Sequence, residues 1–275
     1  TGTAEPPLKN WLDLVAVGTI CDMVPLTGPN RVMVRFGLSA LNARQNVGLA
    51  ALARVSKIKD EDPITVMNIG FGLGPRINAG SRVHQADLGS RLLSTTDAVE
   101  AMRLAEILDD CNTKRREIEQ ATVAHALKIV ADQGLDTHPV IIVDHPDWHP
   151  GVAGLVATRL KDKYNKPVAV VTYAKRGDGT VEARGSGRSV KGFNIATLFQ
   201  NARAAGHLLK GGGHAMAGGF SLRPDQLDAF KQFVRDEGAR LSADVDPTPE
   251  QMADSLAFVR TLNVGTARVL SDQLG

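Results

Sequence analysis

Cysteine and long apolar runs are scarce in this chain, and each scarcity excludes a class of protein. The 275 residues include two cysteines, Cys21 and Cys111, with no Cys-x-x-Cys spacing, which argues against a zinc site and a disulfide framework. No apolar run approaches the ~20 residues of a membrane span, and the first residues lack the basic-then-apolar pattern of a signal peptide. We therefore expect a cytoplasmic globular protein without membrane contact.

Aromatic residues and net charge are also scarce. Aromatics make up 4% of the chain, too few for a rich platform on which nucleic-acid bases would stack. The 32 basic and 30 acidic residues leave a net charge of +2, so a nucleic-acid surface would have to be a local patch. A hydrophobic content of 43% over this length suits one large or two modest domains.

The pattern of apolar residues and helix breakers predicts an α/β fold. Residues 11–20 read as a buried helix or strand, and residues 30–53 have helical spacing with Gly37 and Gly48 as punctuation; we interpret both segments as part of an α/β layer. After residue 134, apolar runs alternate with helical patterns, and the glycines fall in the expected loops. We expect strands at 140–143, 167–173, 180–184 and 215–222, and helices at 152–164, 193–202 and 224–241.

One long helix is expected between these two regions. Residues 97–133 contain no proline or glycine and are rich in helix formers, which predicts a single helix with Thr96 as its N-cap and Gly134 after its end. At ~1.5 Å per residue it would span roughly 55 Å and link two bodies. The run Lys114-Arg115-Arg116 on this helix is most simply a solvated face balanced by Glu117 and Glu119.

Two stretches in the second body are suited to phosphate. Residues 210–219 contain three consecutive glycines followed by His214, and glycines let several backbone N–H groups approach one anion. Residues 183–189 read Ala-Arg-Gly-Ser-Gly-Arg-Ser and supply two guanidiniums and two hydroxyls for phosphate oxygens. A flexible turn would explain the glycines equally well. The presence of both stretches in one small domain favours a nucleic-acid or nucleotide site.

Five stretches, in this order, resemble the RecJ-like single-strand exonucleases of the DHH phosphoesterase superfamily. They are residues 18–26, 72–79, 148–152, 185–189 and 213–217. The resemblance covers roughly residues 12–241. It implies the rear part of a DHH catalytic domain at 1–95, a linker helix at 96–134, a smaller α/β DHHA1 substrate-binding domain with a mixed sheet at 135–242, and a linker or divergent tail at 243–275.

The resemblance implies an incomplete metal centre. Asp22 matches the last carboxylate of a two-metal centre that uses Mn²⁺ or Mg²⁺, whereas most of the family's ligands, including an Asp-His-His triplet, belong to an amino-terminal half that this sequence does not contain. We therefore expect no tight metal site and no exonuclease activity from the chain alone. Without the surrounding motif, Asp22 would be interpreted as a helix cap or turn residue.

The resemblance also implies contacts with the substrate in the second body. Ser186 and Arg188 match the family's pocket for the terminal phosphate of single-stranded DNA. His214, after Gly212 and Gly213, would donate to the scissile phosphate as a catalytic residue, with closure of the glycine turn as its structural alternative.

Three further residues have two interpretations each. Arg82 matches the family arginine that faces the substrate, although Ser81 departs from the family pattern, and it is otherwise a surface arginine. Arg76 would contact a phosphate or form a structural ion pair. His149, before Pro150, would orient a phosphate or cap a helix.

The activity that the resemblance implies is 5′-to-3′ hydrolysis of phosphodiester bonds in single-stranded DNA, in DNA repair and recombination. Single-stranded DNA, a single-strand-binding protein and a helicase would be the partners. Two alternatives stay open. One is a phosphodiesterase for oligonucleotides or a cyclic dinucleotide within the same superfamily, and the other is a non-catalytic nucleic-acid-binding module.

Overall fold

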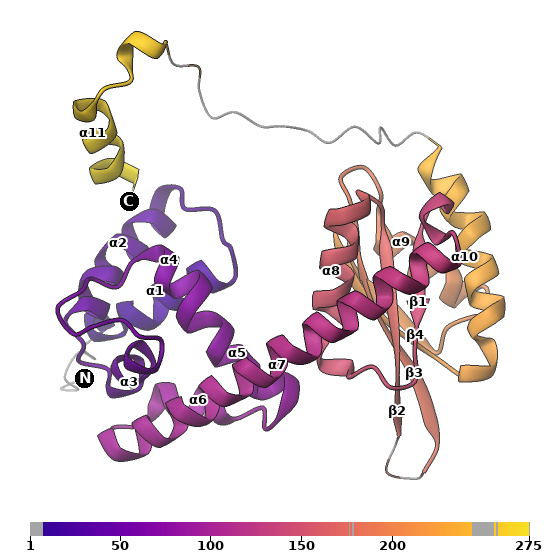
Figure 1. The fold of residues 1–275 in the computed structure, drawn as a ribbon, viewed down its shortest axis with the longest axis horizontal. Helices are drawn as coiled ribbons and strands as arrows, with labels where there is room; N and C mark the ends of the chain where they lie inside the picture. Colours follow the sequence, from indigo (N-terminus) through magenta and orange to yellow (C-terminus); the bar gives the residue numbers. More distant parts are fainter. Residues whose placement is uncertain (1–7, 176, 178, 244–255, 257, 275) are drawn as a thin grey trace, which may run out of the picture. The chain divides into compact units, whose positions relative to one another are not determined.

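The chain divides into two compact units in the computed structural model, which describes residues 8–175, 177, 179–243, 256 and 258–274. Unit 1 comprises Thr1–Lys114 with Met252–Gly275, and unit 2 comprises Arg115–Gln251. The boundary between them falls inside one helix, α7 (Ala98–Asp132) (Figure 1). Among the described residues, no helix combines the length and the apolar character needed to cross a bilayer.

The regular elements in the described residues of unit 1 are all helical. Its elements are η1 (Leu8–Trp11), α1 (Leu12–Cys21), α2 (Gly28–Asn42), α3 (Val47–Val55), α4 (Val66–Asn68), the π-helical turn η2 (Ile69–Leu73), α5 (Gly74–Val83), α6 (Leu88–Ser94), η6 (Val259–Thr261) and α11 (Val264–Leu274). The expectation of an α/β layer at residues 11–53 is therefore wrong. Apolar spacing in a short run does not separate a buried helix from a buried strand, and here it forms helix α1.

Glycines in unit 1 allow close helix packing. A side chain at Gly37, inside α2, would bring a Cβ within 2.2 Å of the Leu12 carbonyl oxygen of α1. A Cβ at Gly48, inside α3, would lie 2.0 Å from the Leu92 carbonyl oxygen of α6. These glycines do not interrupt their helices, because each one lies where a neighbouring backbone approaches too closely for any side chain.

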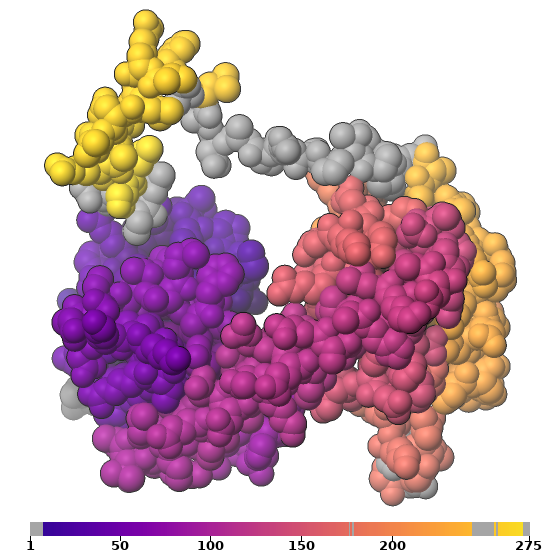
Figure 2. All heavy atoms as spheres, in the orientation of Figure 1, coloured from indigo at the N-terminus to yellow at the C-terminus, as the bar shows by residue number. Residues whose placement is uncertain are grey.

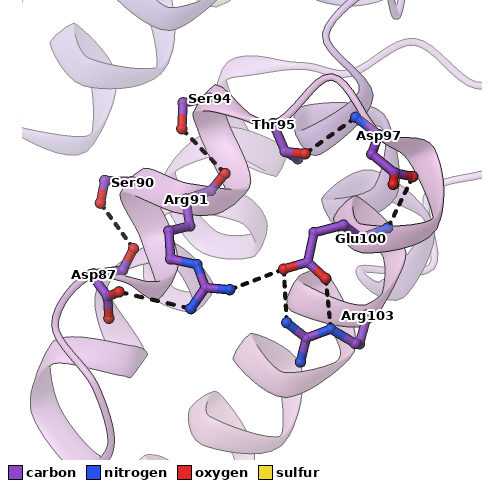
Figure 3. Close-up of polar contacts among 8 residues, drawn as sticks. All are labelled: Asp87, Ser90, Arg91, Ser94, Thr95, Asp97, Glu100 and Arg103. Atoms are coloured by element: carbon purple, nitrogen blue, oxygen red, sulfur yellow. Dashed lines mark hydrogen bonds and ion pairs between the residues drawn. The ribbon is translucent and has the colours of Figure 1, made fainter.

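The long helix is confirmed as one continuous element of 35 residues. Its N-cap is Asp97 and not Thr96, because the Asp97 carboxylate accepts hydrogen bonds from the backbone N–H groups of Val99 (2.8 Å) and Glu100 (3.3 Å). Figure 3 shows the contact with Glu100. Gly134 follows its end with a left-handed φ of 62°, as a C-terminal glycine should. The first part of α7 packs in the core of unit 1 through Leu104 and its neighbours, and the later part packs in unit 2.

Unit 2 is built on a mixed sheet of five strands in the order β1-β2-β3-β5-β4. The strands are β1 (Ile141–Asp144), β2 (Val168–Lys175), β3 (Val181–Arg188), β4 (Lys210–His214) and β5 (Ala217–Leu222). Strand β1 pairs with β2 in parallel, and the remaining pairs are antiparallel. Its other elements are η3 (Leu135–Thr137), η4 (Pro150–Val152), α8 (Ala153–Tyr164), α9 (Ile195–Ala204), η5 (Pro224–Gln226) and α10 (Leu227–Ser242).

Two expectations about the strands of unit 2 are corrected. The glycine run is not a loop: residues 210–214 form the edge strand β4, and only Ala215 and Met216 separate it from β5. Strand β3 also continues past Arg184 to Arg188, so all of the second motif except Ser189 lies in a strand. Both runs pair along their length with β5, which favours the extended conformation over the turn that their glycines suggest locally.

Helices cover the sheet of unit 2 on both sides. Helices α9 and α10 cover one face, with Phe199 and Phe230 in the core against Phe220 of β5. Helix α8 and the later part of α7 cover the other face over β1 and β2 (Figure 1). The ends of β2 and β3 project from the body of the unit (Figures 1 and 2).

Candidate nucleic-acid interface

Alternate residues of strand β3 have different roles, because the glycines pack against aromatic rings and the polar residues lie on the opposite face. A Cβ at Gly185 would lie 2.0 Å from the Phe220 ring, and a Cβ at Gly187 would lie 2.6 Å from the Phe199 ring. The glycines of the Gly-Ser-Gly-Arg-Ser motif therefore admit aromatic rings on the face covered by α9 and α10. Since alternate side chains of a strand point to opposite faces, Ser186 and Arg188 lie on the other face.

The sheet register brings most of the expected residues of unit 2 onto that second face. Arg188 pairs with Ala217, which pairs with His214, and Ser186 pairs with Gly219, which pairs with Gly212. Directly paired residues share a face, and neighbouring strands lie about 4.8 Å apart. We call this surface the open face; its members are Arg184, Ser186, Arg188, Lys210, Gly212, His214, Ala217 and Gly219.

Small residues keep the centre of the open face uncluttered. Between the polar side chains of β3 and the edge strand β4, strand β5 contributes only Ala217 and Gly219 in these two rows. Gly219 and His214 are exposed. An extended ligand would lie on this floor without meeting a bulky side chain, with polar groups from β3 on one side and from β4 on the other.

Helix α8 begins beside Ser186 and Arg188. A Cβ added to Gly154, in the first turn of α8, would stand 2.9 Å from Nη2 of Arg188 and 3.7 Å from Oγ of Ser186. The guanidinium also donates to the Gly187 carbonyl at 2.8 Å. The amino-terminal end of a helix carries partial positive charge, which adds to that of the guanidinium. A guanidinium, a hydroxyl and a helix amino terminus thus meet at one point, and this combination suits a phosphate.

His149 caps the turn that leads into α8. Its Nδ1 accepts a hydrogen bond from the Gly151 backbone N–H at 3.1 Å, which makes His149 the N-cap of η4. The cap interpretation is therefore seen directly, and it leaves the Nε2 side of the ring for another contact. The loop with this cap runs straight into the helix turn that contains Gly154.

The hairpin between β4 and β5 positions His214. Gly213 has a φ of 147°, and a Cβ there would lie 2.4 Å from the Ala217 carbonyl oxygen, so only glycine fits. The turn is tied to the rest of the unit because Ser189 N–H donates to the Met216 carbonyl (2.9 Å). Gly213 shapes the hairpin, whereas His214 is presented at its end.

Asp22 lies in unit 1 at the C-terminal end of α1. It is exposed, and its backbone N–H donates to the Gly18 carbonyl at 3.0 Å. Met23 follows with a φ of 54°, an uncommon conformation for a residue with a side chain, and is 88% exposed. The parts of the chain that the structure describes contain no group of three or more histidines, cysteines, aspartates or glutamates able to hold a metal ion. Asp22 by itself does not fit a two-metal centre.

The two arginines of α5 differ in their surroundings. Arg76 forms an ion pair with Asp109 of α7, with Nε 2.7 Å from Oδ1, and Nη1 donates to the Gly72 carbonyl at 2.9 Å. This is the structural ion pair that the sequence left open, and it ties two helices of unit 1 together. Arg82 is half-buried near the end of α5. Asp22, Arg76 and Arg82 belong to unit 1, and the open face belongs to unit 2.

Sequence reasoning missed Gly154 and Lys210. Gly154 lacks any side chain that could mark it as part of a site, and its importance comes from the space that it leaves for Arg188. Lys210 shares a row with Ser221 and Arg184 and adds positive charge to the open face. Treating residues 183–189 as a strand of period two would have separated the glycines from Ser186 and Arg188. No sequence signal specified their partners on β5 and β4.

Comparisons with known proteins identify similar chains. Residues 137–238 match the family model of the DHHA1 domain. The single-stranded-DNA-specific exonuclease RecJ of Dickeya dadantii is 40% identical over 241 residues, and that of Escherichia coli is 39% identical over 235 residues. These alignments cover 86% and 83% of this chain but only 41% and 40% of the relatives. The chain thus spans about 40% of the length of the curated relatives that it matches.

Solved structures show the same relationship. RecJ of Thermus thermophilus in complex with Mn²⁺ has a TM-score of 0.73 and 34% identity, with 86% of this chain and 33% of that chain covered. A crystal structure of exonuclease RecJ bound to manganese gives a TM-score of 0.71 at 33% identity, with 88% and 59% covered. The α/β fold with a mixed sheet and a long helix is confirmed. Residues 137–238 match the DHHA1 domain model, and the chain is similar to the RecJ exonucleases over most of its length.

Proposed function

We propose that the open face of unit 2 binds the terminal phosphate of single-stranded DNA, as the substrate-binding part of a RecJ-like 5′-to-3′ exonuclease. The observation that carries the proposal is the meeting of Arg188, Ser186 and the first turn of α8 around Gly154. A bidentate guanidinium and a hydroxyl match the oxygens of a phosphate end, and a phosphate end has more charge and more free oxygens than an internal phosphodiester.

The remaining contacts of the proposal lie further from Arg188, and the first of them is on strand β4. His214 lies one strand beyond Ala217, so Arg188 and His214 are two strand spacings apart, about 9.6 Å between backbones. In this proposal His214 donates a hydrogen bond to the scissile phosphate. Gly212 and Gly213 allow the DNA backbone to approach β4 closely, and His149 contacts the strand through its free ring nitrogen. In unit 1, Arg82 is the arginine that we propose to contact a phosphate, whereas the Arg76 guanidinium is engaged by Asp109.

The metal chemistry of the proposal does not reside in the described residues alone. Two divalent ions, Mn²⁺ or Mg²⁺, would activate water and neutralise the scissile phosphate. Asp22 would be one of several carboxylates that hold them. Calorimetry of the chain with Mn²⁺ should therefore show at most weak binding. A stoichiometric micromolar site that Asp22→Ala abolishes would contradict this expectation and reveal ligands that the sequence pattern does not contain.

The proposal places the chain in DNA repair and recombination. In this proposal the substrate is single-stranded DNA, the protein acts in the cytoplasm, and a single-strand-binding protein and a helicase are the partners that would supply and present single strands. These assignments rest on the similarity to the RecJ exonucleases, whereas the terminal-phosphate site rests on the geometry of the open face.

The test compares two arginines on the same face of the same strand. Arg188→Ala should weaken binding of a 5′-phosphorylated oligonucleotide by about 1–3 kcal/mol, the scale of a charge-assisted hydrogen bond, and should leave an unphosphorylated oligonucleotide nearly unaffected. Arg184→Ala is the matched control, because Arg184 lies two residues away and pairs with Glu182 (2.8 Å). Fluorescence anisotropy with both oligonucleotides measures the difference. Equal losses for both oligonucleotides in Arg188→Ala would make Arg188 a general backbone contact and would refute the terminal pocket.

A further inference from the structure

A second surface of unit 2 has the chemistry of a binding site. A groove of about 450 Å³ lies between α7 and α8, and all of its lining residues belong to unit 2. Its rim contains three guanidiniums, those of Arg115, Arg116 and Arg159, and its apolar part is formed by Val123, Ala124 and Leu127. None of the lining residues is aromatic.

Two of the three arginines of the groove, Arg115 and Arg159, are held by one buried carboxylate. Glu119 is 8% exposed and accepts from Arg115 Nη1 at 2.7 Å and from Arg159 Nε at 3.2 Å. The expectation that Lys114-Arg115-Arg116 and its glutamates form a solvated face is therefore wrong for Arg115 and Glu119, whose side chains are 12% and 10% exposed. The packing of α8 against α7 buries them. Because the lining contains three guanidiniums and one carboxylate, the groove has an excess of positive charge.

The groove is separate from the terminal-phosphate site. Both sites use α8, but Gly154 faces Ser186 and Arg188, whereas Arg159 is five residues further along. At 3.6 residues per turn, Arg159 points roughly 140° around the helix axis from Gly154. A ligand in the groove therefore occupies a different flank of α8 from the one that meets the open face.

We propose that this groove binds a short acidic peptide segment of a partner protein, anchored by one large apolar side chain. Carboxylates of the peptide would pair with the exposed guanidiniums of Arg116 and Arg159, and the apolar side chain would cover Val123 and Leu127. A nucleic-acid strand fits less well, because the groove has no aromatic ring for base stacking and its apolar floor offers nothing to phosphates. Gln120, also in the lining, supplies an amide for the peptide backbone.

The test uses a fluorescein-labelled octapeptide, Asp-Glu-Asp-Glu-Phe-Asp-Glu-Gly, and the full chain. The double variant Arg116→Ala/Arg159→Ala should weaken its binding by about tenfold or more, because both rim charges are lost. The matched control is Arg203→Ala/Arg240→Ala, which removes the same charge from exposed helix positions. Arg240 is as exposed as Arg159, at 65%, and likewise pairs with a glutamate, Glu237. The control should bind the peptide within about twofold of the unaltered chain.

Two further measurements distinguish specific binding in the groove from non-specific electrostatic attraction. Replacing the phenylalanine of the peptide by glycine should cost about fivefold or more, since the apolar anchor is then missing. An unlabelled thymidine octanucleotide of similar charge should not displace the peptide. Equal losses in both double variants, or no detectable binding, would overturn the proposal. Displacement by the octanucleotide, with its own binding lost in Arg116→Ala/Arg159→Ala, would instead make the groove a nucleic-acid contact. Because this test never uses Arg188, its failure leaves the terminal-phosphate proposal untouched.

Discussion

The two faces of the sheet in unit 2 use glycine for opposite purposes. On the face covered by α9 and α10, the rings of Phe220 and Phe199 occupy the space that side chains at Gly185 and Gly187 would need. On the open face, no heavy atom lies within 4 Å of a Cβ built at Gly212, and at Gly219 the nearest is 3.8 Å away. The first two glycines thus contribute to stability through packing. The other two leave room for a ligand.

This difference explains why one motif serves the fold and the site together. In a strand, neighbouring residues face opposite sides, so Gly-Ser-Gly-Arg alternates between the core and the open face without any loop. Substitutions on the face covered by α9 and α10 should therefore lower stability, whereas substitutions on the open face should mainly change binding. The size of each effect on stability depends on how close the nearest atoms lie to the added Cβ.

The largest effect is expected for Gly185→Ala. The added Cβ would lie 2.0 Å from Cζ and 2.4 Å from the two Cε atoms of Phe220, a ring that contacts both Phe199 and Phe230. Overpacking of this kind costs about 1–3 kcal/mol or more. Urea unfolding of the chain, followed by circular dichroism, measures the loss. An unchanged midpoint would mean that the face covered by α9 and α10 tolerates a side chain, and the comparison between faces would fail.

A smaller and different effect is expected for Gly154→Ala. Here the added methyl meets the far end of a flexible side chain, Nη2 of Arg188 at 2.9 Å, so the guanidinium moves and the fold is kept. Binding of a 5′-phosphorylated oligonucleotide should weaken by about 1 kcal/mol, while the unfolding midpoint stays the same. Thr158→Ala, one turn further along α8, is the matched control. A variant that loses stability and keeps its affinity would show that Gly154 serves packing alone.

Acid should weaken the attachment of α10 to α9 through one carboxylate. Hydrogen bonds from Arg240 and then from Asn201 (2.6 Å) lower the pKa of Glu237 from 4.5 to about 2. A lowered pKa in the folded state contributes stability that is present above the ordinary value and is lost as the pH falls through about 2. Glu237→Gln should therefore flatten the fall in unfolding free energy between these two pH values. If both proteins lose stability in parallel across that interval, Glu237 does not couple the helices.

On the open face, Gly219→Ala should change stability far less than Gly185→Ala. The nearest atom to its Cβ, the Gly185 carbonyl oxygen, lies at ordinary contact distance, and glycine in a strand costs conformational entropy. The unfolding free energy should stay within about 0.5–1 kcal/mol of the original or rise slightly. Urea unfolding beside Gly185→Ala gives the comparison directly. A loss as large as that of Gly185→Ala would mean that the open face is packed against something in solution.

Local sequence patterns determined several parts of this protein. A stretch free of glycine and proline across residues 97–133 is enough to predict α7, because a long helix depends on local hydrogen bonds and intrinsic propensity. The β-branched runs predicted β1 and β2, and five ordered motifs indicated the relatives. Pro150 after His149 was sufficient to suggest the cap that the structure shows.

Tertiary structure decided where those motifs meet. The glycine run became strand β4 because β5 was available to pair with it, and this pairing placed His214 and Gly212 in rows with Arg188 and Ser186. Likewise, Arg115 and Glu119 became buried because Arg159 of α8 reaches the same carboxylate from 40 residues away. Such outcomes depend on strand register and helix packing between distant segments. A one-residue shift in register would turn every side chain of β5 to the opposite face, and no local pattern in one sequence specifies that choice.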